Sequence, residues 1–389
     1  MKIIAINRGD TGSSGSLAKS ILKNAQDNGD EVILACAFPS TSDIKTKRIS
    51  HSRFLNKVSG LLSRIFGNDG FGNIFSTLIF LKWLKNEKPD VIHIHTLHGH
   101  YINVEMLFNF IVRNKIKTIM TLHDCWAFTA KCPYYLHINC SAWKCNKCNT
   151  KCPHQKDYPS SYFKNNMHSL LERKNNLYHK AKEYLTLVSV SNWLDKEVAQ
   201  SCVSDIKHVC IQNNIAIRKY QFKRIKRTKP IIFSAAYPWN KTKNLNSIIR
   251  FANLYKDFYT FYIAGLEKTL DNKSIISLGK LNKEQMFYYY YQSDVFLNLS
   301  FEESFGLTNI EAQSQGTPVI CSINSGGTSD TFINNKTGYF VDPNDNLDIH
   351  NAIEKCLINK IQIEKDCKEF AKTFSSNQMN ESYYKLYHL

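Results

Sequence analysis

The chain has 389 residues, of which 43% are hydrophobic, 12% aromatic and 21% charged. This composition excludes a disordered or low-complexity protein, and the length exceeds what one hydrophobic core usually serves, so we expect two domains. Lysine and arginine (50) outnumber aspartate and glutamate (33), and the resulting net charge of +17 favours phosphate-rich partners such as an anionic membrane. The basic residues form no nucleic-acid motif, so we expect no nucleic acid among the partners.

The first residues, MKIIAINRGD, contain no apolar core of a signal peptide, and no stretch is long and apolar enough to span a membrane. We therefore expect a cytoplasmic protein. Its twelve cysteines are then expected to remain as thiols or to bind metal.

Short apolar runs alternate with helical stretches along the whole chain. In order, the runs are KIIAI, EVILACAF, DVIHIHT, TIMTLHD, LTLVSVS, PIIFSAA, FYIAG, VFLNLS and TPVICS. This alternation predicts an α/β protein with parallel sheets. A polar basic stretch, IAIRKYQFKRIKRTKP, separates the fifth run from the sixth and marks the domain boundary. We predict domains at 1–215 and 216–370, with a final helix at 371–389 returning toward the first domain.

Ligands of such sheets bind where strands end, and two α/β domains imply a cleft between them. The first run is followed by Gly9, Gly12 and Gly15, where glycines let backbone amides approach a phosphate or sugar. We take Gly12 as a donor-binding candidate, against the alternative of a tight turn without a ligand. The spacing fits neither the dinucleotide-binding fingerprint nor a P-loop.

Histidines lie at two other strand ends. His93 and His95 share one face of a strand and His98 follows in the loop, a trio that suggests either metal or, more commonly, buried hydrogen-bonded histidine. His123 ends the next run beside Asp124, which makes both of them candidates for the active site.

Two features of the first domain suggest binding sites, one for a metal ion and one for a membrane surface. Six cysteines lie between Cys125 and Cys152, in an insertion at about 125–160; the spacing of Cys145 and Cys148, with others nearby, is typical of structural zinc, against reduced or redox-labile thiols. Between Arg53 and Phe66, apolar residues recur at helical spacing among basic ones. This pattern predicts an amphipathic helix that either lies on an anionic membrane or covers the sheet.

The segment FEESFGLTNIEAQSQGTPVICS follows the run VFLNLS. It predicts a loop with Gly306, a helix from Leu307 or Thr308 that carries Asn309 and Glu311, and a strand from Thr317. Free amides at the helix N-terminus can hold a diphosphate or sugar hydroxyls, and carboxylates accept hydrogen bonds from hydroxyls.

This segment resembles the E-x7-E signature of the retaining family-four glycosyltransferases, and the match extends through NIEA, GTPVI, SGG and TGYFV. The resemblance implies the GT-B fold, two Rossmann-like domains facing a cleft. It implies that Glu303 and His123 contact the donor sugar and that Glu311 binds the nucleotide ribose.

The N-terminal half resembles the branch of that family that assembles capsule, exopolysaccharide or lipopolysaccharide. The matching segments are GDTGSSGS, GFGN, PDVIHIHTLHGHYIN, TLHDCWAFTAKCPYY and CPHQKDYP. For zinc, this resemblance favours the set of Cys132, Cys140, Cys148 and Cys152, with Cys145 additional.

The family usually has an arginine and a lysine after the first strand of the second domain, to hold the diphosphate. Here AAYPWNKTKNL offers Lys241 and Lys243 without arginine, and Asn244 stands where glycine is usual. Lys243 fits the family lysine better; solvated surface lysine is the alternative. The sequence has no Asp-x-Asp, so we expect catalysis to require no metal or other cofactor.

The sequence therefore predicts a retaining hexosyltransferase. It moves a sugar from a nucleoside diphosphate to a growing, lipid-linked surface glycan at the inner face of the plasma membrane. Two alternatives stay open: a GT-B enzyme with a soluble small acceptor, such as a sucrose-phosphate synthase or a nucleotide-sugar epimerase, and an inactive glycan-binding protein with the same fold.

Overall fold

A computed structural model describes residues 1–40, 43–50, 52–144, 148, 152–162, 166–216, 220 and 222–389; Cys145 lies outside these residues. The chain divides into two units, which we describe separately. The N-terminal unit comprises residues 1–212 and 379–389, and the C-terminal unit comprises residues 213–378. The division thus falls at 212, close to the expected boundary at 215.

The N-terminal unit contains a parallel sheet of seven strands in the order β3-β2-β1-β4-β5-β6-β7. The strands are β1 (Lys2–Asn7), β2 (Glu31–Cys36), β3 (Thr46–Arg48), β4 (Val91–Ile94), β5 (Lys117–Leu122), β6 (Leu185–Ser189) and β7 (His208–Cys210). The central strands are apolar along nearly their whole length because helices cover both faces of such a sheet.

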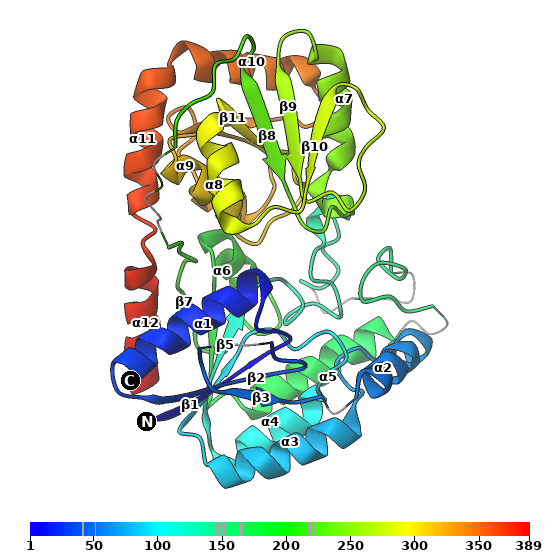
Figure 1. Cartoon of the computed structure of the whole chain (residues 1–389). Helices are drawn as coiled ribbons and strands as arrows, with labels where there is room; N and C mark the ends of the chain where they lie inside the picture. Colours follow the sequence, from blue (N-terminus) through cyan, green and yellow to red (C-terminus); the bar gives the residue numbers. More distant parts are fainter. Residues whose placement is uncertain are drawn as a thin grey trace. The chain divides into compact units, whose positions relative to one another are not determined.

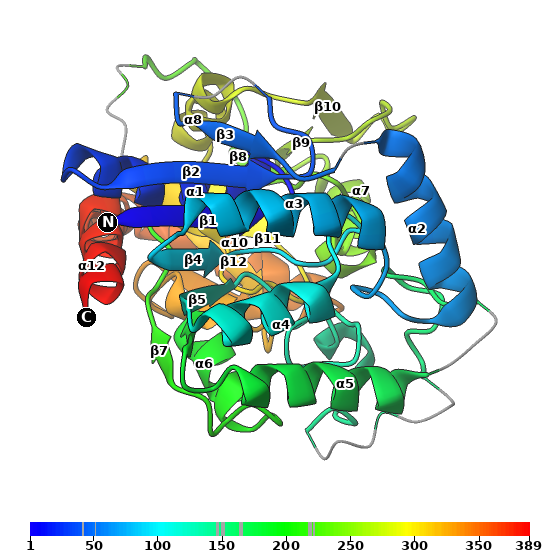
Figure 2. The same ribbon diagram turned by 90° about the horizontal axis from the view of Figure 1, so that it is seen from below.

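The helices of this unit follow the strands in alternation (Figure 1). They are α1 (Gly12–Asp27), α2 (Arg53–Phe66), α3 (Ile74–Glu87), α4 (Val104–Asn114), η1 (Leu136–Ile138), α5 (Met167–Lys180) and α6 (Asn192–Ala199). Figure 2 shows α3, α4 and α5 side by side across one face of the sheet. Because helices cover the faces of the sheet, functional residues are expected in the loops that follow the strands.

The last helix, α12 (Ser376–His388), packs on the N-terminal unit beside α1 (Figures 1 and 2). The hydroxyl of Tyr387 is 2.6 Å from Nδ1 of His93, and the hydroxyl of Tyr383 is 3.0 Å from Oγ1 of Thr121. Both tyrosines are buried. The segment therefore completes the core around β4 and β5.

The C-terminal unit contains a parallel sheet of six strands in the order β10-β9-β8-β11-β12-β13. The strands are β8 (Ile231–Ala235), β9 (Thr260–Ala264), β10 (Ile275–Gly279), β11 (Val295–Asn298), β12 (Val319–Ser322) and β13 (Gly338–Val341). The helices are η2 (Lys241–Lys243), α7 (Leu245–Tyr255), α8 (Lys283–Gln292), α9 (Leu307–Ser314), η3 (Gly327–Asp330), α10 (Asn346–Ile358) and α11 (Lys360–Lys372).

Alternate residues of the same strand build two separate cores in this unit. Ile232 and Val295 belong to one buried cluster, whereas Phe233 and Phe296 belong to another. Successive side chains of a strand point to opposite faces, so both faces of the sheet are buried under helices.

In each sheet the first strand of the unit lies in the middle, and later strands are added first on one side of it and then on the other. This order reverses between β1 and β4 in one unit and between β8 and β11 in the other. This is the Rossmann strand order, in which ligands bind at the reversal, beyond the carboxyl ends of the strands. The prediction of two parallel-sheet α/β domains is confirmed. We call each reversal the switch point of its unit.

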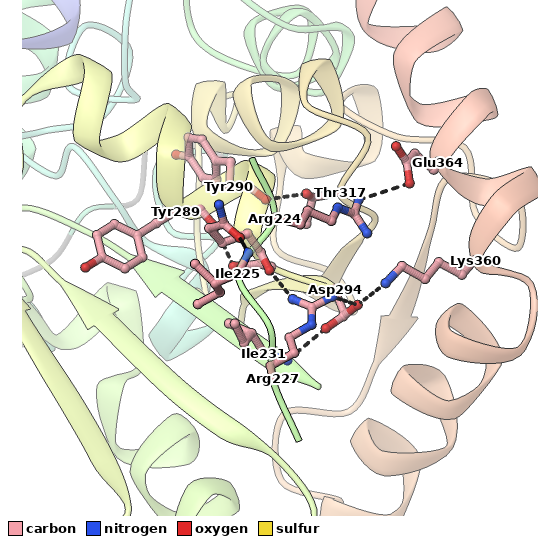
Figure 3. Close-up of polar contacts among 12 residues, drawn as sticks. Arg224, Ile225, Arg227, Ile231, Tyr289, Tyr290, Asp294, Thr317, Lys360 and Glu364 are labelled. Carbon is pink, nitrogen blue, oxygen red and sulfur yellow. Dashed lines mark hydrogen bonds and ion pairs between the residues drawn. The ribbon is translucent and has the colours of Figure 1, made fainter. Parts of the chain in front are cut away.

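The basic stretch that precedes β8 is bound to its own unit (Figure 3). A guanidinium nitrogen of Arg227 and Nζ of Lys360 lie 2.7 and 2.5 Å from one carboxylate oxygen of the buried Asp294. Arg224 pairs with Glu364 at 3.0 Å. Part of the positive charge is thus neutralised internally.

Candidate functional site

Two loops meet at the switch point of the C-terminal unit, one after β8 and one after β11. The backbone N–H of Phe301 donates to the carbonyl of Thr242 at 2.8 Å, and Nδ2 of Asn244 donates to the carbonyl of Leu299 at 3.0 Å. These bonds hold η2 against the segment that leads into Glu303.

An ion pair joins these loops. Nζ of Lys243 is 2.7 Å from Oε1 of Glu303, and the hydroxyl of Ser300 donates to the same oxygen at 2.9 Å. The backbone of Glu303 is fixed on both sides by bonds with Ser325 and Gly327. With 19% and 16% of their side chains exposed, Lys243 and Glu303 are accessible to a ligand yet held in place. An ammonium and a carboxylate so arranged can bind a phosphate and a hydroxyl.

Asn244 adopts the conformation that the glycine of related sequences would provide. Its φ is +51° in the left-handed region, which asparagine tolerates better than most residues other than glycine. The replacement of glycine therefore leaves the turn after Lys243 intact.

The amino end of α9 carries the predicted diphosphate seat. Gly306 precedes the helix with φ +105°, and no side chain among the described residues caps the helix there. The amides of Leu307 and Thr308 lie in the first turn, where backbone N–H groups lack intrahelical acceptors. A helix terminus of this kind attracts anions.

The side chain of Asn309 points inward. It is fully buried, and it hydrogen-bonds with Asn298, Cys321 and Thr331. These contacts link α9 to β11 and β12, so the side chain acts in positioning α9.

Glu311 follows one turn later on α9. The hydroxyl of Tyr290, from α8, donates to its carboxylate at 3.3 Å. Burial raises the pKa of Glu311, and the nearby Lys283 and the bond from Tyr290 offset only part of this effect. A carboxylate with one weak donor retains acceptor capacity for ligand hydroxyls.

The switch point of the N-terminal unit begins at the glycine loop after β1. Gly12 starts α1 with φ +77°, and Gly15 is packed so tightly that a Cβ would lie 2.6 Å from the carbonyl carbon of Asp10. Among the described residues no side chain caps α1 at Thr11. The loop therefore presents a second uncapped helix terminus.

Three histidines line the ends of β4 and β5. Both ring nitrogens of His93 are hydrogen-bonded, to Tyr387 and Thr121, and burial lowers its pKa to about 3. Nδ1 of His95 is 3.0 Å from Nε2 of His123. Burial also lowers the pKa of His123 to about 4, although Asp124 beside it acts in the opposite direction. These imidazoles are neutral at physiological pH.

His98 and Asp124 form a second polar pair at this edge. Nε2 of His98 is 2.9 Å from Asp124, and its Nδ1 is 3.1 Å from the hydroxyl of Tyr158. Burial raises the pKa of Asp124, but His98 and the N–H of Trp126 outweigh it and the pKa is lowered. His95, His98, His123, Asp124 and Trp126 are among the side chains that line a small pocket.

The four candidate zinc cysteines lie within the described residues and form no disulfide. The thiols of Cys132 and Cys152 are hydrogen-bonded to each other, which lowers the pKa of Cys152 to about 6 and raises that of Cys132. Burial raises the pKa of Cys148 to about 11, and Cys140 and Cys152 act on it in the same direction. The loop thus brings the four thiols close enough to influence one another.

Helix α2 is oriented with its small residues inward. Ser59, Gly60 and Ser63 are buried, whereas Leu61 and Leu62 are exposed. Leu61 and Leu62 therefore do not cover the sheet, whereas Leu55, Val58 and Ile65 are half-buried.

Helix α3 repeats this orientation. Ser76 and Thr77 are buried, while Phe75 and Leu78 are exposed. Asn73, which precedes α3, donates to Asn56 of α2 at 2.7 Å, so the two helices are neighbours. We call the exposed apolar residues of both helices the apolar patch; they are Phe54, Leu61, Leu62, Phe66, Ile74, Phe75, Leu78 and Ile79. Within the part of the chain that the structure describes, no helix combines the length and hydropathy needed to cross a membrane.

The structure brings the predicted residues together in two groups. One group, in the C-terminal unit, joins Lys243 to Glu303; the other, in the N-terminal unit, includes His123 and Asp124. Sequence reasoning did not assign a role to Tyr158, which contacts His98, or to Tyr290, which contacts Glu311. Each tyrosine is distant in sequence from its partner, so no local pattern marks it.

Comparison with known proteins gives matches in sequence. Residues 217–374 match the family described as glycosyl transferases group 1. An uncharacterized 41.2 kDa protein of the cps region of Klebsiella pneumoniae is 26% identical over 329 residues, covering 80% of this chain and 82% of that protein. A putative colanic acid biosynthesis glycosyl transferase of Escherichia coli K12, WcaC, is 31% identical over 110 residues, which is 26% of each chain.

Solved structures share the whole fold. Sucrose-phosphate synthase of Thermosynechococcus elongatus superposes with a TM-score of 0.70 at 14% identity, covering 100% of this chain and 98% of that one. The HepE protein of Anabaena, in complex with UDP-glucose, gives 0.69 at 13% identity, with 100% of both chains covered. The two Rossmann-like units therefore have the GT-B fold of these structures. The match of residues 217–374 to the glycosyl transferases group 1 indicates that the chain is a glycosyltransferase.

Proposed function

We propose that the chain transfers a hexose-type sugar, with retention of anomeric configuration, from a nucleoside diphosphate to a growing, lipid-linked surface glycan. The observation that carries this proposal is the pair of Lys243 and Glu303, 2.7 Å apart at the switch point. The cps-region and colanic acid relatives support a glycan of the cell surface, and the complex of HepE with UDP-glucose supports a nucleotide-sugar donor.

The C-terminal unit binds the donor in this proposal. Lys243, with Lys241 beside it, neutralises the charge that develops on the leaving diphosphate, and the backbone N–H groups from Gly306 to Thr308 donate hydrogen bonds to its oxygens. Glu303 accepts a hydrogen bond from a hydroxyl of the donor sugar. Glu311 accepts hydrogen bonds from the ribose hydroxyls, which stand in for the water that a buried carboxylate cannot reach.

The N-terminal unit supplies a neutral imidazole, that of His123, and the carboxylate of Asp124. His123 and Asp124 hydrogen-bond hydroxyls of the reacting sugar, and the loop at Gly12 offers backbone amides. Catalysis requires no metal in this scheme.

The donor-binding assignment is tested with a panel of nucleotide sugars. A donor that binds the folded state raises Tm. We expect one nucleotide sugar to stabilise the wild type and to stabilise Glu303→Ala and Glu311→Ala less. A wild type that responds to no donor, or variants that respond as the wild type does, would remove the site. Transfer to a lipid-linked acceptor rather than to a soluble sugar phosphate separates the two enzymatic alternatives.

We propose that the enzyme lies at the inner face of the plasma membrane, and the apolar patch of α2 and α3 supports this location. Arg53, Lys57 and Arg64 are exposed on α2, so cations accompany the apolar side chains, as expected for a surface that contacts anionic lipid. We expect co-sedimentation with liposomes that contain phosphatidylglycerol to fall when Leu61 and Leu62 become serine. Unchanged co-sedimentation would exclude the patch.

The proposal includes a structural zinc ion held by Cys132, Cys140, Cys148 and Cys152. The contact between the thiols of Cys132 and Cys152, and the low pKa of Cys152, support thiolate ligation. Protein purified without chelator is expected to contain stoichiometric zinc. A folded, metal-free protein would exclude this site.

A further inference from the structure

A second group of metal-ligating side chains lies in the same insertion, separate from the cysteines. His137, His154 and Asp157 each offer one nitrogen or oxygen, and these atoms lie within 4.8 Å of one another. The two imidazole rings are 5.0 Å apart, measured between centroids. The fold thus brings His137 close to His154 and Asp157, which follow later in the insertion.

His154 is the most deeply buried of the three residues, with only 3% of its surface exposed. Its Nδ1 is 3.2 Å from a carboxylate oxygen of Asp157. Two ligands of one tetrahedral ion lie roughly 3 Å apart, so this nitrogen and this oxygen are placed to bind the same cation.

A cation at this point would bind Nδ1 of His154. The second imidazole adds a lone pair, and the carboxylate of Asp157 adds the negative charge that a cation needs. Two imidazoles with one carboxylate suit a borderline transition metal such as Zn²⁺, with water as the fourth ligand.

Lys131 holds the turn that carries His154 and Asp157 through hydrogen bonds to its backbone. This lysine is buried, and its Nζ donates to the carbonyls of Gln155 at 2.9 Å and Pro159 at 2.8 Å. Tyr158, next to Asp157, contacts His98 in the pocket of the N-terminal unit. A metal ion here would therefore fix the turn from which Tyr158 reaches that pocket.

We propose that His137, His154 and Asp157 bind one divalent transition-metal ion, Zn²⁺ in the cell, which ties η1 to the turn at 152–158. This site is distinct from the zinc proposed for the four cysteines, and it does not depend on the proposed transfer reaction. It is a structural site in this proposal, because the ion would hold η1 and the turn at 152–158 together.

Cobalt distinguishes the two sites, because Co²⁺ replaces Zn²⁺ and absorbs visibly. The full-length chain is stripped with chelator, kept reduced and titrated with Co²⁺. Nitrogen and oxygen ligands give visible d–d bands alone, whereas thiolates add charge-transfer absorption in the near ultraviolet. We expect the wild type to show bands of a site without thiolate, in addition to any thiolate-bound cobalt.

The variant His154→Ala should bind one Co²⁺ fewer than the wild type and lose these bands. The affinity loss should exceed the roughly 10–100-fold that removal of a second-shell partner produces. His168→Ala is the matched control, since His168 is an exposed histidine of the same unit. His137→Gln repeats the test in a more conservative form, and circular dichroism verifies that each variant is folded.

The double variant Cys132→Ser/Cys152→Ser should retain the bands, because the proposed ligands contain no sulfur. The proposal is overturned by a wild type that binds no Co²⁺. It is equally overturned by cobalt that shows only thiolate absorption, or by a stoichiometry that is the same in folded His154→Ala or His137→Gln as in the wild type.

Discussion

The switch points of the two units occupy the same place in the same strand order, yet they carry different chemistry. In the C-terminal unit an ammonium and a carboxylate, Lys243 and Glu303, are paired and partly exposed. In the N-terminal unit the strand ends carry His93, His95 and His123, whose burial favours the neutral ring. Topology fixes where a ligand binds, whereas the surroundings of each side chain decide whether that place suits charge or hydroxyl groups.

The largest effect should come from removing the cation of the C-terminal switch point. Lys243→Met leaves Glu303 without its ion pair and the leaving diphosphate without its nearest cation. We expect kcat to fall about 100- to 1000-fold, the loss typical of one electrostatic contact to a developing charge. Initial rates of sugar transfer measure this. Lys273→Met, at an exposed lysine of the same unit, is the control, and a fall below about tenfold would place the charged chemistry elsewhere.

Glu311→Gln should weaken donor binding and stabilise the free protein at once. Hydrogen bonds to a charged acceptor contribute roughly 1.5–3 kcal/mol, so donor affinity should fall about 10- to 100-fold. Burial raises the pKa of Glu311, so ionisation of this group opposes folding above its ordinary pKa, and an amide removes that penalty. Calorimetric titration and Tm without ligand measure the two effects. A variant less stable than the wild type would contradict the assignment of an uncompensated carboxylate.

The neutral histidines predict acid sensitivity of the N-terminal unit. The pKa of His123 is lowered from 6.5 to about 4, so between these values the unfolded chain binds a proton that the folded chain does not. Stability is therefore lost as pH falls from about 6.5 to about 4. His123→Asn should lose less, by about 2–4 °C in Tm for each kcal/mol removed.

Thermal unfolding at pH 7, 6, 5 and 4 measures this difference, with His168→Asn as the exposed control. His95, His98 and Asp124 face His123 and remain in the variant. A variant with the same pH dependence as the wild type would show that His123 is already solvated or protonated, and the contrast between the switch points would disappear.

The smallest effect concerns Asn244. Asn244→Gly keeps the φ of +51° and loses only the bond from Nδ2 to Leu299, so activity should change by less than about threefold. Asn244→Ala loses the same bond and should destabilise by a further ~1–2 kcal/mol through left-handed strain. Denaturant unfolding and transfer rates compare the two. A glycine variant that is much more active would mean that asparagine had weakened the charged switch point.

The central strands were predictable from sequence because they are apolar on both faces. The runs KIIAI and VFLNLS correspond to β1 and β11, and the helix expected from Leu307 begins at that residue. The strands that sequence reasoning missed were β3, β7, β10 and β13, at or next to sheet edges. Strand β7 is only half-buried along its length, so its hydrophobic signal is weak.

The candidate residues were predictable as types, and less so as contacts. The sequence placed Asn309 on the helix of the candidate donor site, but it could not show that the side chain is fully buried in a hydrogen-bond network. Periodicity identified the amphipathic helix at 53–66, yet it could not tell which side faces the protein, since Ser59 and Ser63 pack inward. Such outcomes depend on neighbours supplied by distant segments.

Helix α12 also determines the order in which the chain can fold. Tyr383 and Tyr387 complete the core beside β4 and β5, yet they are synthesised after all of residues 213–378. Domains often fold during translation, N-terminal part first. Here the N-terminal unit must wait for the ribosome to finish the other unit.

Both chain ends approach Asp30, with the amino group of Met1 at 2.8 Å and Nε2 of His388 at 3.5 Å from its carboxylate. A short linker could therefore join them. In a circular permutant that starts at Met379 and runs through that linker into Met1, the N-terminal unit would be contiguous. It would then complete its core while still attached to the ribosome.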